Sequence, residues 1–537
     1  MAISVTGTII GFITSLIQSQ IASLKKGKSP IIEGNHTLIL AWSSRVFPIL
    51  QQLAVANSNV SNPLVVIFAN KGRELMDDEI SARVGDLGKT RVVTRSGDTT
   101  NPRELERANV GAAKSIIILD ADESGDANVV ATVLAVRAVT GNSNVAIVAE
   151  VDDPNHALTL AHATKGQVRA VRSNDVIARV TAQASRQPGL ASVVLDMLDF
   201  EGDEIYFGNA SELVGRTYGD AVTAFNKAAI IGIQTSDGVV GLNPAAATII
   251  NTGDKVIAIA ADDDQLVFTG FRDDLAATSA PRGVGESPRH AEHILAISWS
   301  NMGRAVLSEL ATFLAEGSSM HIVSDPRFVD QSTFENLKFG HVAVTHSATS
   351  GNIHELIKVA SAKKYDEIII LGYREAINEA DADATTMLTM LQMNQLFAEE
   401  RNGAQETRLV TEILDSRKAE LARVATADDL VVSDNLAALM IAQIPENPAH
   451  APVLEDLFDA QGASLNVKPI ELYTSASQVT FAELAASARS RGESAIGYRT
   501  AKHAKGDPAS GVVLNADKST VYQPAKGDGL VVIGPLE

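Results

Sequence analysis

The sequence contains no cysteine among its 537 residues. This absence excludes a disulfide framework, thiolate zinc sites and a cysteine nucleophile, and it fits a reducing compartment. Aromatic residues make up only 4% of the chain, and the formal net charge is −20. Because no basic stripe interleaved with aromatics occurs, nucleic acid is not an expected partner. The 45% hydrophobic and 20% charged content is that of a folded protein, and the length predicts several domains.

The first 24 residues carry no charged side chain, and three lysines follow within Lys25–Lys28. A secretory signal places its positive residues before the apolar stretch, whereas this order is typical of the cytoplasmic end of a membrane helix. Gln18 and Gln20 weaken a complete span, and an amphipathic helix docked on the protein or on a bilayer surface is the alternative. We therefore expect the rest of the chain on the cytoplasmic side of a membrane.

The chain repeats itself once. Its only two tryptophans, Trp42 and Trp299, lie in matching segments, and Pro188 with the helix pattern after it matches Pro448 with its own helix pattern. The other matching segments are Ser115–Asp120 with Glu367–Gly372, and Val148–Asp153 with Val410–Asp415. Two copies of a unit of roughly 250 residues therefore build the chain, and this period is too long for a solenoid.

Each copy begins with short apolar runs that alternate with helix patterns. In the first copy, the runs that predict buried strands are 36–41, 64–69, 91–94, 115–119 and 146–150. Strands rich in Val, Ile and Leu between helices are typical of a parallel sheet covered on both faces. The predicted fold class is therefore α/β, with a doubly wound Rossmann-like lobe, a crossover helix and a small strand-rich lobe in each copy.

These patterns predict six segments along the chain. They are the end of a membrane helix and its linker (1–28), the first Rossmann lobe (29–188), the first crossover helix and small lobe (189–277), a linker (278–292), the second Rossmann lobe (293–446), and the second crossover helix and small lobe (447–537). The crossover helices carry apolar stripes within Leu190–Leu198 and Val453–Phe458, and such stripes need a partner surface. Either the two helices exchange contacts within one chain, or each covers its own lobe.

Neither Rossmann lobe has the glycine-rich loop that lets a backbone approach a pyrophosphate. Ala41–Val46 contains no glycine, Ser298–Gly303 keeps only its last residue, and each segment holds a tryptophan in the turn. Dinucleotide binding in the usual pose is therefore disfavoured. Asn70 replaces the ribose-binding acid in the first lobe, where we expect no nucleotide, whereas Asp325 is the candidate cofactor-binding residue in the second. The chain also lacks a nucleophile elbow and a zinc-protease motif, so we expect no enzyme.

Acidic residues follow the fourth and fifth predicted strands of the first copy. They are Asp120, Asp122, Glu123, Asp126, Glu150, Asp152 and Asp153. Because these strands are neighbours in the doubly wound order, the two groups are expected to converge. Carboxylates on flexible loops suit a hard cation such as Ca²⁺. The alternative is that these acids complement helix dipoles and stay solvated.

The tandem arrangement behind the end of a membrane helix resembles the regulator-of-K⁺-conductance (RCK) gating rings of ligand-gated channels. Several segments, irregular loops among them, are similar to the Castor/Pollux family of cation channels. They are Gly11–Thr14, Ser23–Ser29, Glu33–Leu40, Trp42–Ser43, Arg95–Gly97, Gln187–Leu190 and Glu412–Arg417. The resemblance implies a homotetrameric ring of eight lobes that couples ligand binding to the opening of a pore for Ca²⁺ or K⁺.

The sequence departs from the family pattern because it holds no selectivity filter and no preceding membrane helices. The pore-forming helices are therefore expected upstream in a longer chain or on another polypeptide. A soluble RCK-type regulatory subunit of a separate K⁺ transporter or channel, for which residues 1–24 are dispensable, is the main alternative. An NAD(P)-binding enzyme is a further alternative, which the missing glycines disfavour.

Overall fold

The computed structural model describes most of the chain. The described residues are 28–121, 125–141, 143, 145–200, 202–281, 290–349, 353–400, 407–424, 429–458, 463–503 and 511–535. The predicted end of a membrane helix lies outside them, and so does most of the predicted linker 278–292. No helix within these ranges is long and apolar enough to cross a membrane.

The chain divides into two compact units. Unit 1 comprises the chain up to Ser173 together with Ala437–Pro448, and unit 2 comprises Asn174–Leu436 together with Ala449–Glu537. These limits do not follow the predicted segments 29–188 and 293–446, because the last helix of each Rossmann lobe is grouped with the sheet of the other copy.

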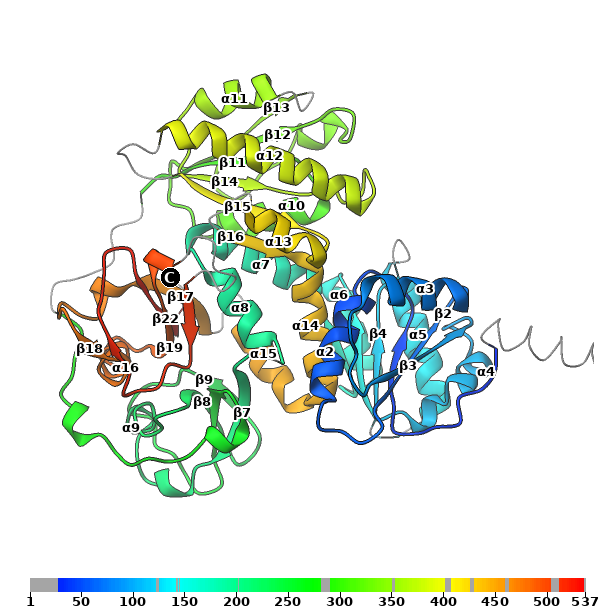
Figure 1. Ribbon diagram of the computed structural model, residues 1–537, viewed down its shortest axis with the longest axis horizontal. Coiled ribbons are helices and arrows are strands. Elements are labelled where there is room, and N and C mark those ends of the chain that lie inside the picture. The colour runs from blue at the N-terminus through cyan, green and yellow to red at the C-terminus, as the bar shows by residue number, and fades with distance from the viewer. Residues whose placement is uncertain are drawn as a thin grey trace, which may run out of the picture. The chain divides into compact units, whose positions relative to one another are not determined.

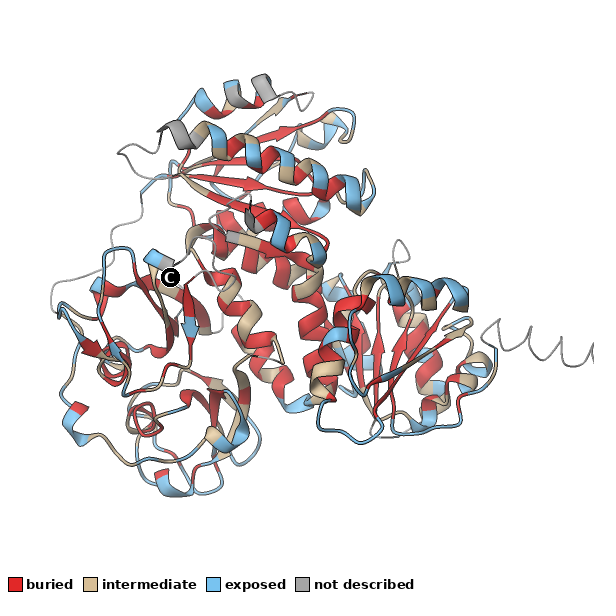
Figure 2. Cartoon of the chain, viewed as in Figure 1, coloured by how far each residue is buried: buried red, intermediate tan, exposed pale blue. Residues whose placement is uncertain are grey.

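Unit 1 contains a six-stranded parallel sheet in the order β3-β2-β1-β4-β5-β6 (Figure 1). Its strands are β1 Thr37–Leu40, β2 Leu64–Ala69, β3 Arg91–Ser96, β4 Ser115–Ile118, β5 Ala146–Glu150 and β6 Val168–Val171. Its helices are α2 Val46–Ala56, α3 Arg73–Arg83, α4 Pro102–Leu105, α5 Asp126–Thr140 and α6 Pro154–Ala163. The central strands are buried along their whole length (Figure 2), because helices cover both faces of a doubly wound sheet. The predicted strands and their topology are confirmed.

Unit 2 contains the second Rossmann sheet, in the same order, β13-β12-β11-β14-β15-β16. Its strands are β11 His293–Ile297, β12 Ser319–Ser324, β13 Ala343–Ala348, β14 Glu367–Ile370, β15 Arg408–Ile413 and β16 Asp429–Val432, and its helices are α10 Asn301–Ala311, α11 Ile353–Ser361, α12 Glu379–Glu400 and α13 Ala419–Val424. One difference separates the copies. Where α3 joins β2 to β3, only the short 3₁₀ turn Gln331–Phe334 lies between β12 and β13.

The two small lobes form one body with a shared core in unit 2. Their four-stranded sheets run β7-β10-β8-β9 and β17-β22-β19-β20. The strands are β7 Glu204–Asn209, β8 Ala229–Gln234, β9 Val240–Leu242, β10 Lys255–Ala260, β17 Ala463–Pro469, β19 Ser494–Arg499, β20 Val512–Leu514 and β22 Gly529–Pro535, and the helices are α9 Tyr218–Ala221 and α16 Phe481–Ser490. Phe225, Ile230, Phe481 and Leu530 all belong to a single buried cluster. The predicted small lobes exist, but they do not pack separately.

Four further helices connect the lobes: α7 Ser173–Arg186, α8 Leu190–Leu198, α14 Ser433–Glu446 and α15 Ala451–Leu457. The crossover helix α8 contacts β7 of its own copy and also β16, β17 and β20 of the second copy. The crossover helix α15 contacts β17 and, from the first copy, β9. Each crossover helix thus contacts a strand of its own copy and strands of the other copy, so the structure combines the two predicted arrangements.

Candidate functional site

The carboxyl ends of the first four strands open onto a pocket of about 410 Å³ in unit 1. Its lining comes from the turn after β1, the loops after β2, β3 and β4, and the side of α5. Asn70, at the predicted ribose position, is among the lining residues, with the hydroxyls of Thr99 and Thr132, whose Oγ1 atoms are 2.9 Å apart. This is the edge at which doubly wound sheets bind ligands, so it is the first candidate site.

The turn after the first strand adopts a left-handed backbone in both copies, although neither residue is glycine. Ala41 has φ of 75° and Ser298, at the matching position, has φ of 69°. The amide of Ala41 donates to the carbonyl of Phe68 (3.0 Å) and that of Ser298 to the carbonyl of Val323 (2.8 Å). A left-handed conformation costs a residue with a Cβ about 1–2 kcal/mol. Strain repeated at one position of a ligand-binding edge is typical of a functional turn.

Trp42 and Lys71, which both line the first pocket, contact each other. The Lys71 ammonium lies 4.5 Å from the centre of the Trp42 ring, and its Nζ is 2.7 Å from both carboxylate oxygens of Glu79. Asp98 accepts hydrogen bonds from the amide and hydroxyl of Thr100 (2.9 and 2.7 Å). The charged side chains that line this pocket are therefore already engaged, and what remains for a ligand is a set of hydroxyl and amide groups beside an indole ring.

The matching edge of the second sheet holds a pocket of about 240 Å³ that Asp325 helps to line. Asp325 is buried, and Arg327 contacts both of its carboxylate oxygens, with Nε 3.0 Å from each. Hydrogen bonds from Arg327 hold the pKa of Asp325 below its ordinary value. The structure thus brings Asp325 to the predicted place, but a ribose could bind its carboxylate only after displacing Arg327. Its cofactor-binding role stays a prediction.

The acidic loops of the first copy do converge, and most of their carboxylates hold the backbone. Glu150, fully buried, forms an ion pair with Arg45 and accepts a hydrogen bond from the Asp120 amide (3.2 Å). Asp126 accepts from the amides of Asp152 and Asp153, each at 2.9 Å. Asp153 caps the start of α6, where it accepts from the Asn155 amide (2.7 Å). The described loops after β4 and β5 are therefore in contact, and hydrogen bonds rather than solvent engage these three acids.

The same pattern recurs in the second copy, where the residues match by sequence. Glu412 forms an ion pair with Arg374 and accepts from the Gly372 amide (3.0 Å), as Glu150 does from Asp120. Asp383 accepts from the amides of Leu414 and Asp415 (2.8 and 3.1 Å), as Asp126 does from Asp152 and Asp153. Because this hydrogen-bond network occurs in both copies, we attribute a structural role to it: it holds the loops after the fourth and fifth strands together.

Acids that occur only in the first copy remain as candidate cation ligands. Asp152 stands where the second copy has Leu414, and Asp120 stands where it has Gly372. Loss of solvent, with the charges of Glu150, Asp120 and Asp126 nearby, raises the pKa of Asp152 to about 6. Within the part of the chain that the structure describes, no three acidic or histidine side chains converge as metal ligands. Asp122 and Glu123 lie outside that part, so the cation site stays a prediction.

Both Rossmann lobes also expose leucines on the helices after their fourth and fifth strands. Leu134 on α5 and Leu158 on α6 are 54% and 59% exposed. In the second copy the exposed leucines are Leu388 and Leu391 on α12 and Leu421 on α13. On α5 the stripe extends through Ala127, Ala131 and Ala138 at helical spacing. Apolar faces of this kind mark interaction surfaces, and the sequence reasoning had looked for them only on the crossover helices.

Comparison with known proteins connects this architecture to channels. A family model described as Castor and Pollux, part of voltage-gated ion channel, matches residues 174–270. Over 98% of its length the chain is 28% identical to a probable ion channel, POLLUX, of Arabidopsis thaliana and 27% identical to the ion channel DMI1 of Medicago truncatula. The resemblance to the Castor/Pollux family is confirmed. The chain spans 68% of the length of the first relative and 63% of the second.

A solved structure shares the fold. The human SLO3 gating ring superposes with a TM-score of 0.64 and 12% sequence identity, covering 93% of this chain and 99% of that one. At such low identity the similarity concerns the fold alone. The predicted fold class, two tandem RCK-type α/β units, is confirmed by this match.

Proposed function

We propose that this chain is the regulatory, gating-ring portion of a cation channel and that it couples ligand binding to pore opening on the cytoplasmic side of a membrane. The observation that carries the proposal is the relation to Castor/Pollux channels over 98% of the chain, which includes both Rossmann copies and both crossover helices. The pore would be formed by helices upstream of residue 28 or on another polypeptide.

Self-assembly follows from the same proposal, with four chains forming a ring of eight lobes. The surface that supports it is the apolar face of α5 and α6, in which Leu134 and Leu158 are more than half exposed. A closed ring needs each copy to bury such a face against a neighbour. Residue Leu75 on α3 is equally exposed, at 59%, but stands alone on a polar helix, so it provides a matched control.

The assembly is tested by mass photometry or light scattering of residues 29–537. The wild type is expected to form tetramers, or dimers that associate further. Replacing Leu134 and Leu158 by Asp places charges in the apolar face and is expected to release smaller species, whereas Leu75→Asp leaves the mass unchanged. A wild type that stays monomeric at micromolar concentration, or a double variant with the wild-type mass, argues against this interface.

The regulatory ligand that the first copy best suits is a divalent cation such as Ca²⁺. The candidate ligands are the acids without counterparts in the second copy, Asp120 and Asp152, together with Asp122 and Glu123. Glu150, Asp126 and Asp153 would support the loops rather than bind the ion, because amides and Arg45 engage their oxygens. A bound cation would also relieve the repulsion from Glu150, Asp120 and Asp126, which adds to burial in raising the pKa of Asp152.

Channel recording tests function and ligand together. The chain is fused behind the pore helices of a tetrameric K⁺ channel, and open probability is measured while cytoplasmic Ca²⁺ is varied. Ca²⁺-dependent gating is expected, and Asp122→Asn with Asp152→Asn is expected to shift the activating concentration upward by tenfold or more. Asp78→Asn, an exposed acid on α3, is the charge control. Gating by Ca²⁺ that the double variant leaves unchanged contradicts the site, and a pore that never responds to the ring contradicts the function.

Two alternatives predict different results. A soluble regulator of a separate K⁺ transporter or channel keeps full activity without residues 1–24, whereas the proposed gating ring loses its mechanical coupling to the pore. An NAD(P)-dependent enzyme would bind the dinucleotide and turn over. We do not expect the enzyme, because Lys71 and Asp98 are engaged in the first pocket and Arg327 contacts Asp325 in the second.

A further inference from the structure

The last residues of α7 and α14 carry opposite charges at matching positions of the repeat. Arg186 ends α7 and Glu446 ends α14, and each stands two residues before one of the matching prolines, Pro188 and Pro448. Each helix is grouped with the sheet of the other copy, because α7 from Asn174 onward belongs to unit 2 and Ala437–Pro448 belongs to unit 1. Each helix therefore ends at the amino edge of the sheet that belongs to the other copy.

In unit 1 the end of α14 meets a basic edge. The Glu446 carboxylate lies 2.8 Å from the Lys114 Nζ and 3.4 Å from the hydroxyl of Thr37, which donates to it. Thr37 begins β1 and Lys114 immediately precedes β4, so both stand at the amino ends of the two central strands. The hydroxyl of Ser115 donates to that of Thr37 at 3.4 Å and completes a polar socket around the helix end.

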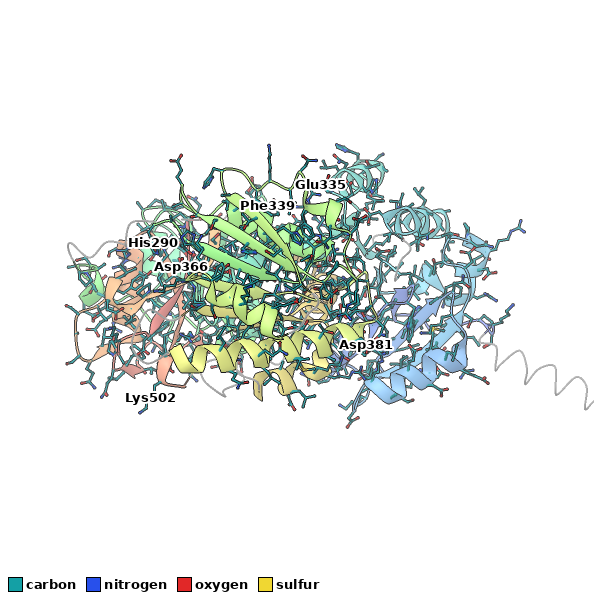
Figure 3. All side chains as sticks on the ribbon, turned by 90° about the horizontal axis from the view of Figure 1, so that it is seen from above. His290, Glu335, Phe339, Asp366, Asp381 and Lys502 are labelled. Atoms are coloured by element: carbon teal, nitrogen blue, oxygen red, sulfur yellow. The ribbon has the colours of Figure 1, made fainter. Side chains whose placement is uncertain are left out.

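In unit 2 the end of α7 meets an acidic edge. The Arg186 NH1 lies 3.3 Å from Glu292, whose other oxygen is 3.3 Å from the Arg408 NH2. Glu367, the first residue of β14, is fully buried 3.8 Å from the same Arg408 nitrogen. Asp366, labelled in Figure 3, comes directly before β14 and accepts a hydrogen bond from the His293 amide at 2.8 Å. The amino edge of this sheet therefore collects three carboxylates.

The matching of the repeat makes the contrast direct. Lys114 and Ser115 of the first sheet correspond to Asp366 and Glu367 of the second. We infer that complementary charge decides which helix end binds the amino edge of each Rossmann sheet, and we call these two edges sockets. The socket with Lys114 binds the Glu446 end of the second-copy helix α14. The socket with Glu292 and Glu367 binds the Arg186 end of the first-copy helix α7. This inference does not depend on the proposed channel function.

The opposite pairing would bury like charges together. A helix α7 docked on its own sheet would place Arg186 against Lys114, and a helix α14 docked on its own sheet would place Glu446 against Glu292. Unpaired or like charges out of water cost far more than a well-paired contact gains. The sockets therefore act mainly by excluding the wrong partner, which is how charge commonly sets specificity between similar surfaces.

The two tryptophans allow the stability of each unit to be measured separately in the full chain, because Trp42 lies in unit 1 and Trp299 in unit 2. In a Trp299→Phe background, urea unfolding followed by fluorescence reports unit 1. Glu446→Gln removes the attraction to Lys114, and Glu446→Arg adds repulsion. The reversed variant is expected to shift the unfolding equilibrium on the order of tenfold beyond the neutral one, and Lys114→Glu added to Glu446→Arg is expected to restore most of the loss.

The second socket and the control complete the test. In a Trp42→Phe background, Arg186→Glu is expected to exceed Arg186→Gln in the same way, because it faces Glu292 and Glu367. Reversal of the exposed pair of Arg91 and Glu33 in unit 1, 3.4 Å apart, is expected to change little. The inference fails if the reversed ends are no worse than the neutral ends. If Glu446→Arg does not fold, folding of the double variant with Lys114→Glu supports the socket, and failure of that double variant refutes it.

Discussion

Glu367 is expected to make unit 2 less stable as the pH rises through neutrality. Burial, with Glu292 nearby, raises the pKa of this carboxyl from 4.5 to about 7, although the charges of Arg408 and Arg186 favour the ionised form. Because the folded protein holds this proton more tightly than the unfolded chain, its stabilising contribution is complete below about pH 4.5 and is lost as the pH rises through 7. The difference in pKa corresponds to about 3 kcal/mol.

Glu367→Gln keeps the shape of the side chain and removes the ionisation. Unfolding free energies are measured by urea titration from pH 5 to 8, with Trp299 as the probe of unit 2. The variant is expected to gain stability over the wild type as the pH rises, by about 2–3 kcal/mol between the two ends of the range, mostly below pH 7. Parallel pH profiles for wild type and variant would refute the reasoning.

Glu412 is the matched control, because it is equally buried in the same sheet but has the opposite shift. Burial alone would raise its pKa, yet Arg374, the Gly372 amide and Ser433 together lower it. Its contribution is therefore present at neutral pH and lost as the pH falls through the lowered pKa. Glu412→Gln is expected to destabilise unit 2 at pH 7 and to leave the slope between pH 5 and 8 unchanged.

Two other substitutions test the strained turn and the shared core. Ala41→Gly relieves the left-handed backbone at φ of 75°, but glycine also makes the unfolded chain more flexible. The balance of the two effects is expected to stabilise unit 1 by about 0.5–1 kcal/mol in urea unfolding. A loss of stability would show that the turn is not strained. Phe481→Ala empties the middle of the core that the two small lobes share and is expected to cost about 3–5 kcal/mol. Hydrogen exchange should then rise in strands β8 and β10 of the first small lobe as well as in β19 and β22, and protection unchanged in β8 and β10 would contradict a single core.

The Rossmann sheets were predictable because their signal is local. The apolar runs 64–69 and 146–150 coincide with β2 and β5, since a strand buried on both faces is apolar along most of its length. The exception is Glu150 at the end of β5, which is paired with Arg45. At the edge of the sheet the apolar run is shorter than the strand it predicts. The run 91–94 ends two residues before β3 does, because Arg95 and Ser96 continue the pairing with Phe68 and Ala69 while their side chains remain polar.

For the candidate sites, the positions of the acidic residues in the fold were predictable, but their contacts were not. Asp325 and the acidic loops lie at the carboxyl ends of strands, as the alternation of strands and helices requires. What an acid does depends on its partner, and some partners are distant in the sequence: Arg45 is 105 residues from Glu150. Arg327, by contrast, lies only two residues after Asp325, and the sequence alone did not show that it pairs with this acid. The left-handed turn at Ala41 was hidden because glycine, its usual signal, is absent. Comparing the two copies residue by residue could have shown that Glu150 and Asp126 have counterparts and that Asp152 has none.

The repeat in the sequence suggests two independent halves, but the packing argues for one interlocked chain. A cut in the predicted linker 278–292 would separate α7 from the second sheet, against which Arg179 pairs with Glu309 at 3.1 Å, and would separate Glu446 from Lys114. It would also divide the core of the small lobes, leaving Tyr218 without the Ser494 hydroxyl 2.6 Å away. Each half would expose a helix face, a charged socket and half of an apolar core. Because the free energy lost by exposing these surfaces is large compared with the few kcal/mol by which domains are stable, the two copies are expected to fold stably only together.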